Sequence, residues 1–308
     1  MMSRDADTLR WGVTRRMEFL EQRLFWEGRV NRADLVREFR VSVPQASADL
    51  SQYQLLAPGN VEYDRREKTY LATADFDPVF GVPTADSYLS RIGHGGTGDA
   101  GGGRAANRED YVVLPELKRR VDAATLRKVV QAIRGRKRIR VRYQSMSSEK
   151  LDWRWMAPHG LAYDGQRWHA RAYCEVHKGF RDFVLSRMFE VDDEQPTSVV
   201  ASCDVAWTTQ VTLRLGPNPK LSEGIRKGLE REYDMKDGVT EIVTPVCLAF
   251  YLGQGFGIDN PDTDKDPARF QIVVVNADAL RVAKNRAEVE TKKALQAARA
   301  SQHLTEGA

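Results

Sequence analysis

The sequence predicts an α+β protein of 308 residues, built from several domains in succession. Three patterns indicate this class. Apolar residues recur with helical spacing near the N-terminus, and apolar and polar residues alternate with the period of a strand in the centre. Towards the C-terminus, strand and helix patterns follow one another in turn. We predict four segments, namely a helical domain (1–75), a linker with helices (76–135), a strand-rich domain (136–200) and an α/β module (201–308).

Composition limits the class of protein. A hydrophobic content of 42% with 29% charged residues is ordinary for a soluble globular chain. No apolar run is long enough to span a bilayer, and the first residues lack the apolar stretch of a secretory signal. Cys174, Cys203 and Cys247 are far apart and never form a C-x-x-C pair, so we expect reduced thiols and neither a metal site nor a cofactor. A cytoplasmic protein with no membrane partner is expected.

Three helices are predicted before residue 56. The first covers 9–27, with Val13, Met17, Leu20 and Leu24 on one stripe. Asn31 is a good cap for a short second helix. Ser42 followed by Gln45 forms a capping box for the third helix, whose predicted buried stripe is Val43, Ala46, Leu50 and Tyr53, with Gln45, Ala48, Asp49 and Gln52 facing outward.

The second and third helices form a helix-turn-helix pattern, and the residues after them predict a wing of two short strands around a charged turn. Small polar residues of the third helix can approach base edges, and basic residues of the wing can reach phosphates. The candidate DNA-binding residues are Ser42, Gln45, Ser47, Gln52, Arg65, Arg66 and Lys68. A three-helix structural module without DNA is the alternative.

The linker region contains two contrasting segments. A glycine-rich stretch at 93–107 predicts a flexible loop, because it lacks apolar anchors. It is followed by a helix from about Asp122, its cap, to Arg134. Between Lys118 and Arg142 there are eleven Lys or Arg and one acid, which favours an anionic partner. A solvated basic face is the alternative.

Strands are predicted near 137–145, 151–162, 166–175 and 180–192, enough for a small antiparallel barrel or curled sheet. In the third of these strands Trp168, Ala170, Ala172 and Cys174 share one face. Arg167, His169, Arg171 and Tyr173 share the other, and Arg181 and Arg187 follow. Such a face suits phosphates and bases better than apolar ligands. A solvated strand is the alternative.

From about residue 205 the order is strand, helix, strand, helix, strand, helix, which predicts a small α/β or ferredoxin-like module. We expect Asn276 to cap the last helix. The stripe of that helix, which can pack inside the module or against a second subunit, is Leu280, Ala283, Ala287, Ala294, Leu295 and Ala298.

Two parts of the chain resemble known families. Phe39, Val41 and Ser42 match the F-x-V-S pattern of DeoR-type winged helices. The central strands resemble the WYL domain in four features, which are Tyr143, Pro158, Trp168 and the Leu185-Ser186-Arg187 unit. Trp168-His169-Ala170 stands where that domain has Trp-Tyr-Leu. The order winged helix, WYL domain and WCX extension resembles the CapW/BrxR type of regulator, which controls bacterial anti-phage operons.

The resemblance implies a homodimeric repressor that binds a palindromic operator. Its WYL domain would have an Sm-like or SH3-like barrel and would bind an anionic ligand such as single-stranded nucleic acid or a nucleotide. Its WCX module would carry the dimer contact. Carried over by position, the ligand-binding residues are Tyr143, Ser145, His169, Arg171, Arg181 and Arg187.

Two other functions compete with this one. Ser145, His169 and Asp182 would be the acid–base groups of an enzyme acting on phosphodiesters. The sequence has no G-x-S-x-G elbow and no H-x-x-x-H metal pair, so no catalytic residue is assigned and a non-enzyme is favoured. A structural adaptor would not explain the winged helix.

Overall fold

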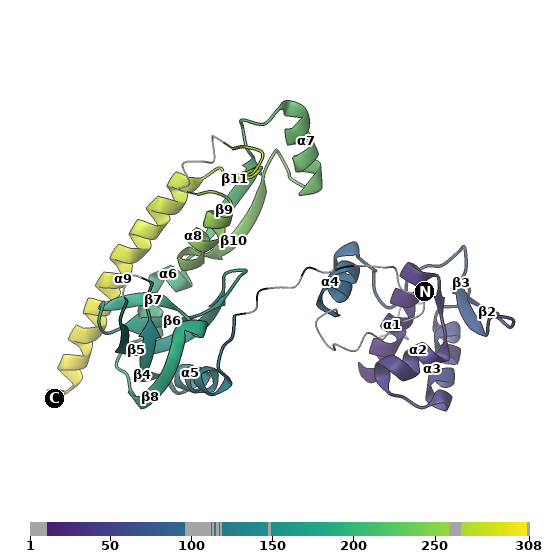
Figure 1. Ribbon diagram of the computed structural model, residues 1–308, viewed down its shortest axis with the longest axis horizontal. Helices are drawn as coiled ribbons and strands as arrows, with labels where there is room; N and C mark the ends of the chain where they lie inside the picture. The colour runs from purple at the N-terminus through teal and green to yellow at the C-terminus, as the bar shows by residue number, and fades with distance from the viewer. Residues whose placement is uncertain are drawn as a thin grey trace. The chain divides into compact units, whose positions relative to one another are not determined.

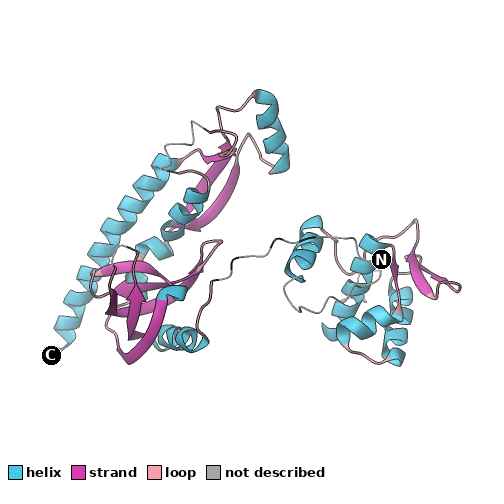
Figure 2. Cartoon of the chain, in the orientation of Figure 1, coloured by secondary structure: helices cyan, strands magenta, loops and turns pink. Residues whose placement is uncertain are grey.

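The chain mixes helices and sheets, as the sequence predicts, in two compact units, Met1–Glu116 and Leu117–Ala308. The computed structural model describes residues 11–95, 112, 114, 117, 119–146, 149–258 and 266–306. Figure 1 labels the elements along the chain, and Figure 2 shows that helices dominate the first unit while sheets lie in both.

The first unit is a winged helix. Its elements are α1 (Trp11–Glu27), β1 (Arg29–Val30), α2 (Arg32–Phe39), α3 (Val43–Leu56), β2 (Val61–Asp64), β3 (Thr69–Ala72) and α4 (Ala85–Gly95). The strands pair antiparallel in the order β1-β3-β2. Met17, Leu20 and Leu24 of α1 are buried against residues of α2 and α3. The predicted three helices and wing are confirmed. Gly93–Gly95 end α4, and residues 96–107 of the predicted flexible loop lie outside the described residues.

The helix caps agree with the sequence, except for one side chain. The Asn31 side chain accepts from the Asp34 N–H, and Asp34 accepts from the Asn31 N–H, forming a capping box on α2. Ser42 Oγ accepts from the Gln45 N–H at 3.3 Å, as predicted for α3. The Gln45 side chain donates instead to Asp49 Oδ1 at 3.0 Å, so the second half of the predicted box is absent.

The buried stripe of α3 differs from the prediction at two residues, Val43 and Asp49. Ala46, Leu50 and Tyr53 are buried as expected, but Val43 is 55% exposed. Asp49, predicted to face outward, is 1% exposed. Its carboxylate accepts from Arg16 Nε at 2.7 Å and Nη2 at 3.0 Å. Because α1 supplies this fork, the charge of Asp49 is paired inside the domain.

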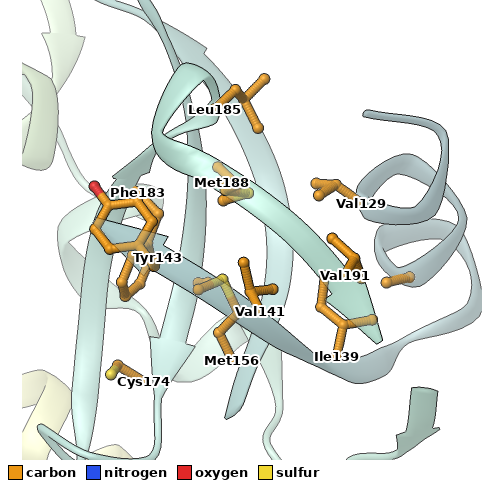
Figure 3. Close-up of a cluster of buried hydrophobic side chains, with 13 residues drawn as sticks. Val129, Ile139, Val141, Tyr143, Met156, Cys174, Phe183, Leu185, Met188 and Val191 are labelled. Carbon is orange, nitrogen blue, oxygen red and sulfur yellow. The ribbon is translucent and has the colours of Figure 1, made fainter. Parts of the chain in front are cut away.

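The second unit begins with a helix packed on a sheet, called here the central sheet. Its elements are α5 (Ala123–Gly135), β4 (Lys137–Gln144), β5 (Leu151–Tyr163), β6 (Trp168–Cys174), β7 (Gly179–Val184), the short 3-10 helix η2 (Leu185–Arg187) and β8 (Met188–Pro196). Asp122 caps α5, as predicted. Ile139, Val141 and Tyr143 alternate into a core with Val129 and Val191, shown in Figure 3.

The central sheet is open. All its pairs are antiparallel, in the order β7-β6-β5-β4-β8, and no pairing of β7 with β8 closes it among the described residues. The expected Sm-like barrel is therefore not confirmed. The 3-10 turn at Leu185–Arg187 interrupts the predicted strand 180–192 and separates β7 from β8.

The C-terminal module follows as α6 (Val205–Thr208), β9 (Gln210–Pro217), α7 (Glu223–Glu232), β10 (Thr240–Pro245), α8 (Val246–Gly255), β11 (Ile272–Val274) and α9 (Ala277–Glu306). A further 3-10 turn, η3 (Ala201–Cys203), precedes it. The predicted alternation is confirmed. Among the residues of this module that the structure describes, three antiparallel strands pair in the order β10-β9-β11. A ferredoxin-like fold has four strands, so that arrangement is not confirmed.

The helix α9 joins this module to the central sheet (Figure 1). Leu280 packs in the module core with Leu213, whereas Leu295 packs with Tyr173 of β6. The stripe therefore packs within the chain. The Asn276 side chain, expected to cap α9, instead accepts from the Arg214 N–H at 3.0 Å and donates to the Thr212 carbonyl at 2.8 Å.

Candidate functional site

The predicted base-reading residues lie on α3, and the structure shows which of their polar groups are already used. Ser47 Oγ donates to the Val43 carbonyl at 3.0 Å, and the Gln45 amide donates to Asp49. Ser42 and Gln45 are exposed, while Ser47 and Gln52 are half-buried. Gln45 keeps its amide oxygen available as an acceptor, because the amide nitrogen makes the contact to Asp49.

The predicted phosphate-contacting residues lie at the tip of the wing. Asp64 Oδ1 accepts from the N–H groups of Arg66 at 2.7 Å and Glu67 at 3.1 Å, which fixes the turn between β2 and β3. Lys68 has a φ of 52°, a left-handed conformation that reverses the chain. Arg65, Arg66 and Lys68 are all exposed. The turn therefore presents three cations on a constrained backbone.

A second candidate site is a cavity of about 560 Å³ beside the central sheet, called here the arginine pocket. Five of the six predicted ligand-binding residues line it, namely Tyr143, Ser145, Arg171, Arg181 and Arg187. Sequence reasoning missed three further basic residues of its wall, Arg154, His177 and Lys284. Lys284 lies on α9, about a hundred residues from the others, so no local pattern signals it.

The arginine pocket has an excess of positive charge. Arg181 and Arg187 have no ion pair with any residue that the structure describes. The Arg154 guanidinium lies 5.2 Å from the ring centroid of Tyr143. Burial, and then the charges of Arg181 and Arg154, lower the pKa of His177 below its ordinary value. The part of this shift that comes from the charges of Arg181 and Arg154 reflects a positive potential, which favours a bound anion.

His169 does not line the arginine pocket. The side chain is 1% exposed, its Nε2 lies 2.8 Å from Asp164 Oδ2, and its ring packs 5.1 Å from that of Tyr251. Burial raises the pKa of Asp164, but hydrogen bonds from His169, Gln166 and Arg167 outweigh it and lower the pKa well below the usual range. His169 is therefore the one predicted ligand-binding residue that the structure does not place in the wall of this pocket.

Arg171 borders the pocket but its charge is already paired. Its Nε and Nη2 donate to the two oxygens of Asp204 at 2.7 and 3.0 Å, and its Nη1 donates to Asp182 at 3.1 Å. His159 Nε2 lies 3.0 Å from Asp204 Oδ2. Burial raises the pKa of Asp204, and the hydrogen bonds from His159 and Arg171 lower it further than burial raises it. This network ties β5, β6 and β7 to the start of the C-terminal module.

The two faces of β6 are thus both buried, contrary to the expected polar, ligand-facing side. Ala170, Ala172 and Cys174 are buried in the core as predicted. On the other face Arg171 is 7% exposed and pairs with Asp204. Tyr173 is 3% exposed and contacts Leu295 and Arg299 of α9. Trp168, expected in the core, is 49% exposed at the strand end.

The basic strand β4 is balanced by acids that lie far away in the sequence. Arg138 donates to Glu175 at 2.6 Å, and Arg142 donates to Glu190 at 3.3 Å. The remaining basic side chains of the strand pair in the same way, Lys137 with Glu194 and Arg140 with Asp192. Because these cations are already paired, the basic face of β4 is better explained as a solvated surface than as an anion-binding site.

Neither a metal-binding cluster nor a membrane-spanning helix is present in the part of the chain that the structure describes. No cluster of three or more His, Cys, Asp or Glu side chains there has the arrangement of a metal site. None of its helices combines the length and the apolar character that crossing a bilayer requires.

Curated relatives match most of the chain. It is 35% identical over 273 residues to the DNA-binding transcriptional repressor CapW of Escherichia coli (strain KTE188), covering 88% of this chain and 91% of that relative. The CapW repressor of Stenotrophomonas maltophilia is 35% identical over 290 residues, covering 91% and 95%. That of Pseudomonas aeruginosa is 34% identical over 281 residues, covering 91% and 94%. The chain belongs to the CapW/BrxR family.

Family models divide this CapW/BrxR chain in order. The BrxR transcriptional regulator winged helix-turn-helix domain matches residues 12–94, and the WYL domain matches residues 124–192. The BrxR transcriptional regulator C-terminal dimerization domain matches residues 210–280. A solved structure of proteasome accessory factor B/C of Arthrobacter aurescens aligns over 92% of this chain and 48% of its own, with 17% identity and a TM-score of 0.25.

Proposed function

We propose that this CapW/BrxR chain is a homodimeric DNA-binding transcriptional repressor. The observation that carries the proposal is the winged helix, with the exposed polar residues of α3 beside a wing whose tip presents Arg65, Arg66 and Lys68. Helix residues at base edges and wing cations at phosphates are the two contact types that a specific protein–DNA interface needs. The CapW relatives, which are named transcriptional repressors, match nearly the whole chain.

Dimerisation follows from the match of residues 210–280 to a dimerization domain. One winged helix covers little DNA, and specific affinity generally comes from two half-sites related by a two-fold axis. We infer a palindromic operator, read by two copies of α3. The family resemblance further suggests a phage-defence operon as the regulated unit.

The repressor is released by an anionic ligand bound in the arginine pocket. Arg181 and Arg187 support this part of the proposal, because they border a cavity and lack an ion pair among the described residues. Guanidinium groups bind phosphates with bidentate, charge-assisted hydrogen bonds. Tyr143, Ser145 and Arg171 remain candidate ligand residues by position, and nucleic acid fragments or nucleotides are the ligands that this charge suits.

Fluorescence anisotropy tests the proposal with labelled duplex DNA taken from upstream of the protein's own gene. We expect saturable binding that weakens as salt rises, because phosphate contacts release counterions. Adding short single-stranded DNA should release the duplex. Absence of specific duplex binding would overturn the repressor assignment, and binding without release would overturn the ligand assignment. Cleavage of the single-stranded DNA during the incubation would indicate an enzyme instead.

A further inference from the structure

A second cavity adjoins the arginine pocket. Its volume is about 340 Å³, within the range of small-molecule sites, and it is called here the aromatic pocket. The two cavities share six wall residues, namely Arg171, Phe180, Asp182, Tyr251, Lys284 and Glu288. They therefore form neighbouring compartments on one side of the central sheet, and a single ligand can occupy both.

The aromatic pocket is chemically unlike its neighbour. One stripe of α8 supplies five of its eleven wall residues, namely Val246, Cys247, Phe250, Tyr251 and Gln254. Phe180 comes from β7 and Ala206 from α6. Lys284 Nζ lies 4.4 Å from the ring centroid of Phe250. Burial raises the pKa of the Cys247 thiol to about 12, so it remains neutral. Three aromatic rings and one amide make this wall suited to a flat, partly polar group.

A buried acceptor lies where the compartments meet. Asp182 Oδ2 accepts from Arg171 at 3.1 Å and from the Tyr251 hydroxyl at 3.3 Å. Its Oδ1 is buried and has no hydrogen-bond partner among the described residues. Buried polar atoms are normally satisfied. A ligand with an N–H or O–H group near the junction would supply the missing donor after a small side-chain movement.

Building on the proposed ligand-released function, we propose that the two compartments together bind a nucleotide unit. Its phosphate lies among Arg154, Arg181 and Arg187, and its base lies against Phe250 and Tyr251. Bases stack on aromatic side chains, and amides such as that of Gln254 hydrogen-bond to base edges. A phosphate alone would leave the aromatic pocket unused. Because α8 and α9 supply seven of its eleven wall residues, base binding acts directly on the C-terminal module.

The test compares two fluorescent single strands with the same number of phosphates, one with bases and one abasic. The full-length protein should bind the strand with bases at least about fivefold more tightly, the lower end expected for stacking one base. Phe250→Ala should remove this preference, and Ala206→Phe should remove it by filling the pocket. Arg181→Ala should weaken binding of both strands equally. Gln296→Ala, exposed on α9 and outside both pockets, is the control.

Different failures have different meanings. Equal binding of both strands by the unmodified protein would overturn the base site and leave the anion-released repressor standing. No binding of either strand would overturn the ligand part of the proposed function itself. Retained preference in a folded Ala206→Phe protein would place the base elsewhere and overturn the assignment. Competition with a mononucleotide distinguishes a free nucleotide from a nucleic-acid strand as the ligand. Full displacement of the labelled strand indicates a free nucleotide, and no displacement indicates a strand.

Discussion

Arg171 on β6 and Asp204 at the start of α6 form a two-point ion pair, with Nε–Oδ2 and Nη2–Oδ1 distances of 2.7 and 3.0 Å. Both side chains are buried, at 8% and 0% exposed. The pair joins the central sheet to the C-terminal module inside one unit. Arg171 is therefore a cross-link of the fold as well as part of the pocket wall.

Arg171→Ala should lower the free energy of unfolding by about 3–5 kcal/mol, because it leaves the Asp204 and Asp182 carboxylates buried without their cation. Arg181→Ala is the matched control, since Arg181 is exposed and should change stability by only about 0.5 kcal/mol. Denaturant titrations of both variants measure the difference. An Arg171→Ala protein as stable as the unmodified one would contradict the structural role and favour a free ligand-binding arginine.

Stability should fall at acidic pH through Asp204 and Asp164. Hydrogen bonds in the fold lower both pKa values below the unfolded value of 3.8. A lowered carboxyl pKa contributes stability that is present above the unfolded pKa and is lost as the pH falls through the folded pKa. Denaturation midpoints measured from neutral pH down to about pH 3 should decline, and Asp204→Asn should flatten that decline. An unchanged slope in Asp204→Asn would contradict the assignment.

The two DNA-contacting elements should respond differently to substitution. Gln52→Ala in α3 should cost about 1–3 kcal/mol at the operator and little on unrelated DNA, because it removes a base contact. Arg65→Ala or Arg66→Ala should weaken binding to every sequence and reduce its salt dependence. Glu67→Ala, which removes an acid from the same turn, is the control for truncating a side chain there and should not weaken DNA binding. Equal operator affinity in all these variants would reject this docking mode.

Arg181→Ala and Arg187→Ala should separate ligand sensing from DNA binding. Both should keep the fold and the operator affinity, since neither side chain has an ion pair among the described residues and both lie outside the winged-helix unit. Ligand release should be lost, giving a repressor that cannot be induced in reporter cells. Arg142→Ala, which removes a cation already paired with Glu190, should respond like the unmodified protein. Normal induction of both pocket variants would exclude them as ligand residues.

Local patterns predicted local structure well. Ser42 marks the start of α3, Asp122 marks the start of α5, and the alternation of Ile139, Val141 and Tyr143 gives the buried face of β4. Each of these signals lies within a few residues of the feature that it predicts, so capping and strand periodicity are enough to find it.

Contacts between residues far apart in the sequence could not be predicted from these local patterns. The polar face of β6 has the pattern of a ligand surface, yet Asp204 and α8 cover it from positions 33 or more residues away. The spacing of Asp49 in the sequence predicts an exposed helix position. In the structure its side chain is buried and pairs with Arg16 of α1. Residue type and resemblance were enough to name five residues of the arginine pocket. Lys284 and the α8 residues of the aromatic pocket could not be named, because their positions depend on how distant segments fold together.

A footprint on the DNA upstream of the protein's own gene tests the repressor assignment most directly. The structure and the family together predict two protected half-sites, related by a two-fold axis and spaced by about one helical turn or a multiple of it. Arg65→Ala should weaken both half-sites together. Absence of any protected site, or protection of one unpaired half-site by a dimeric protein, would contradict a homodimeric operator-binding repressor.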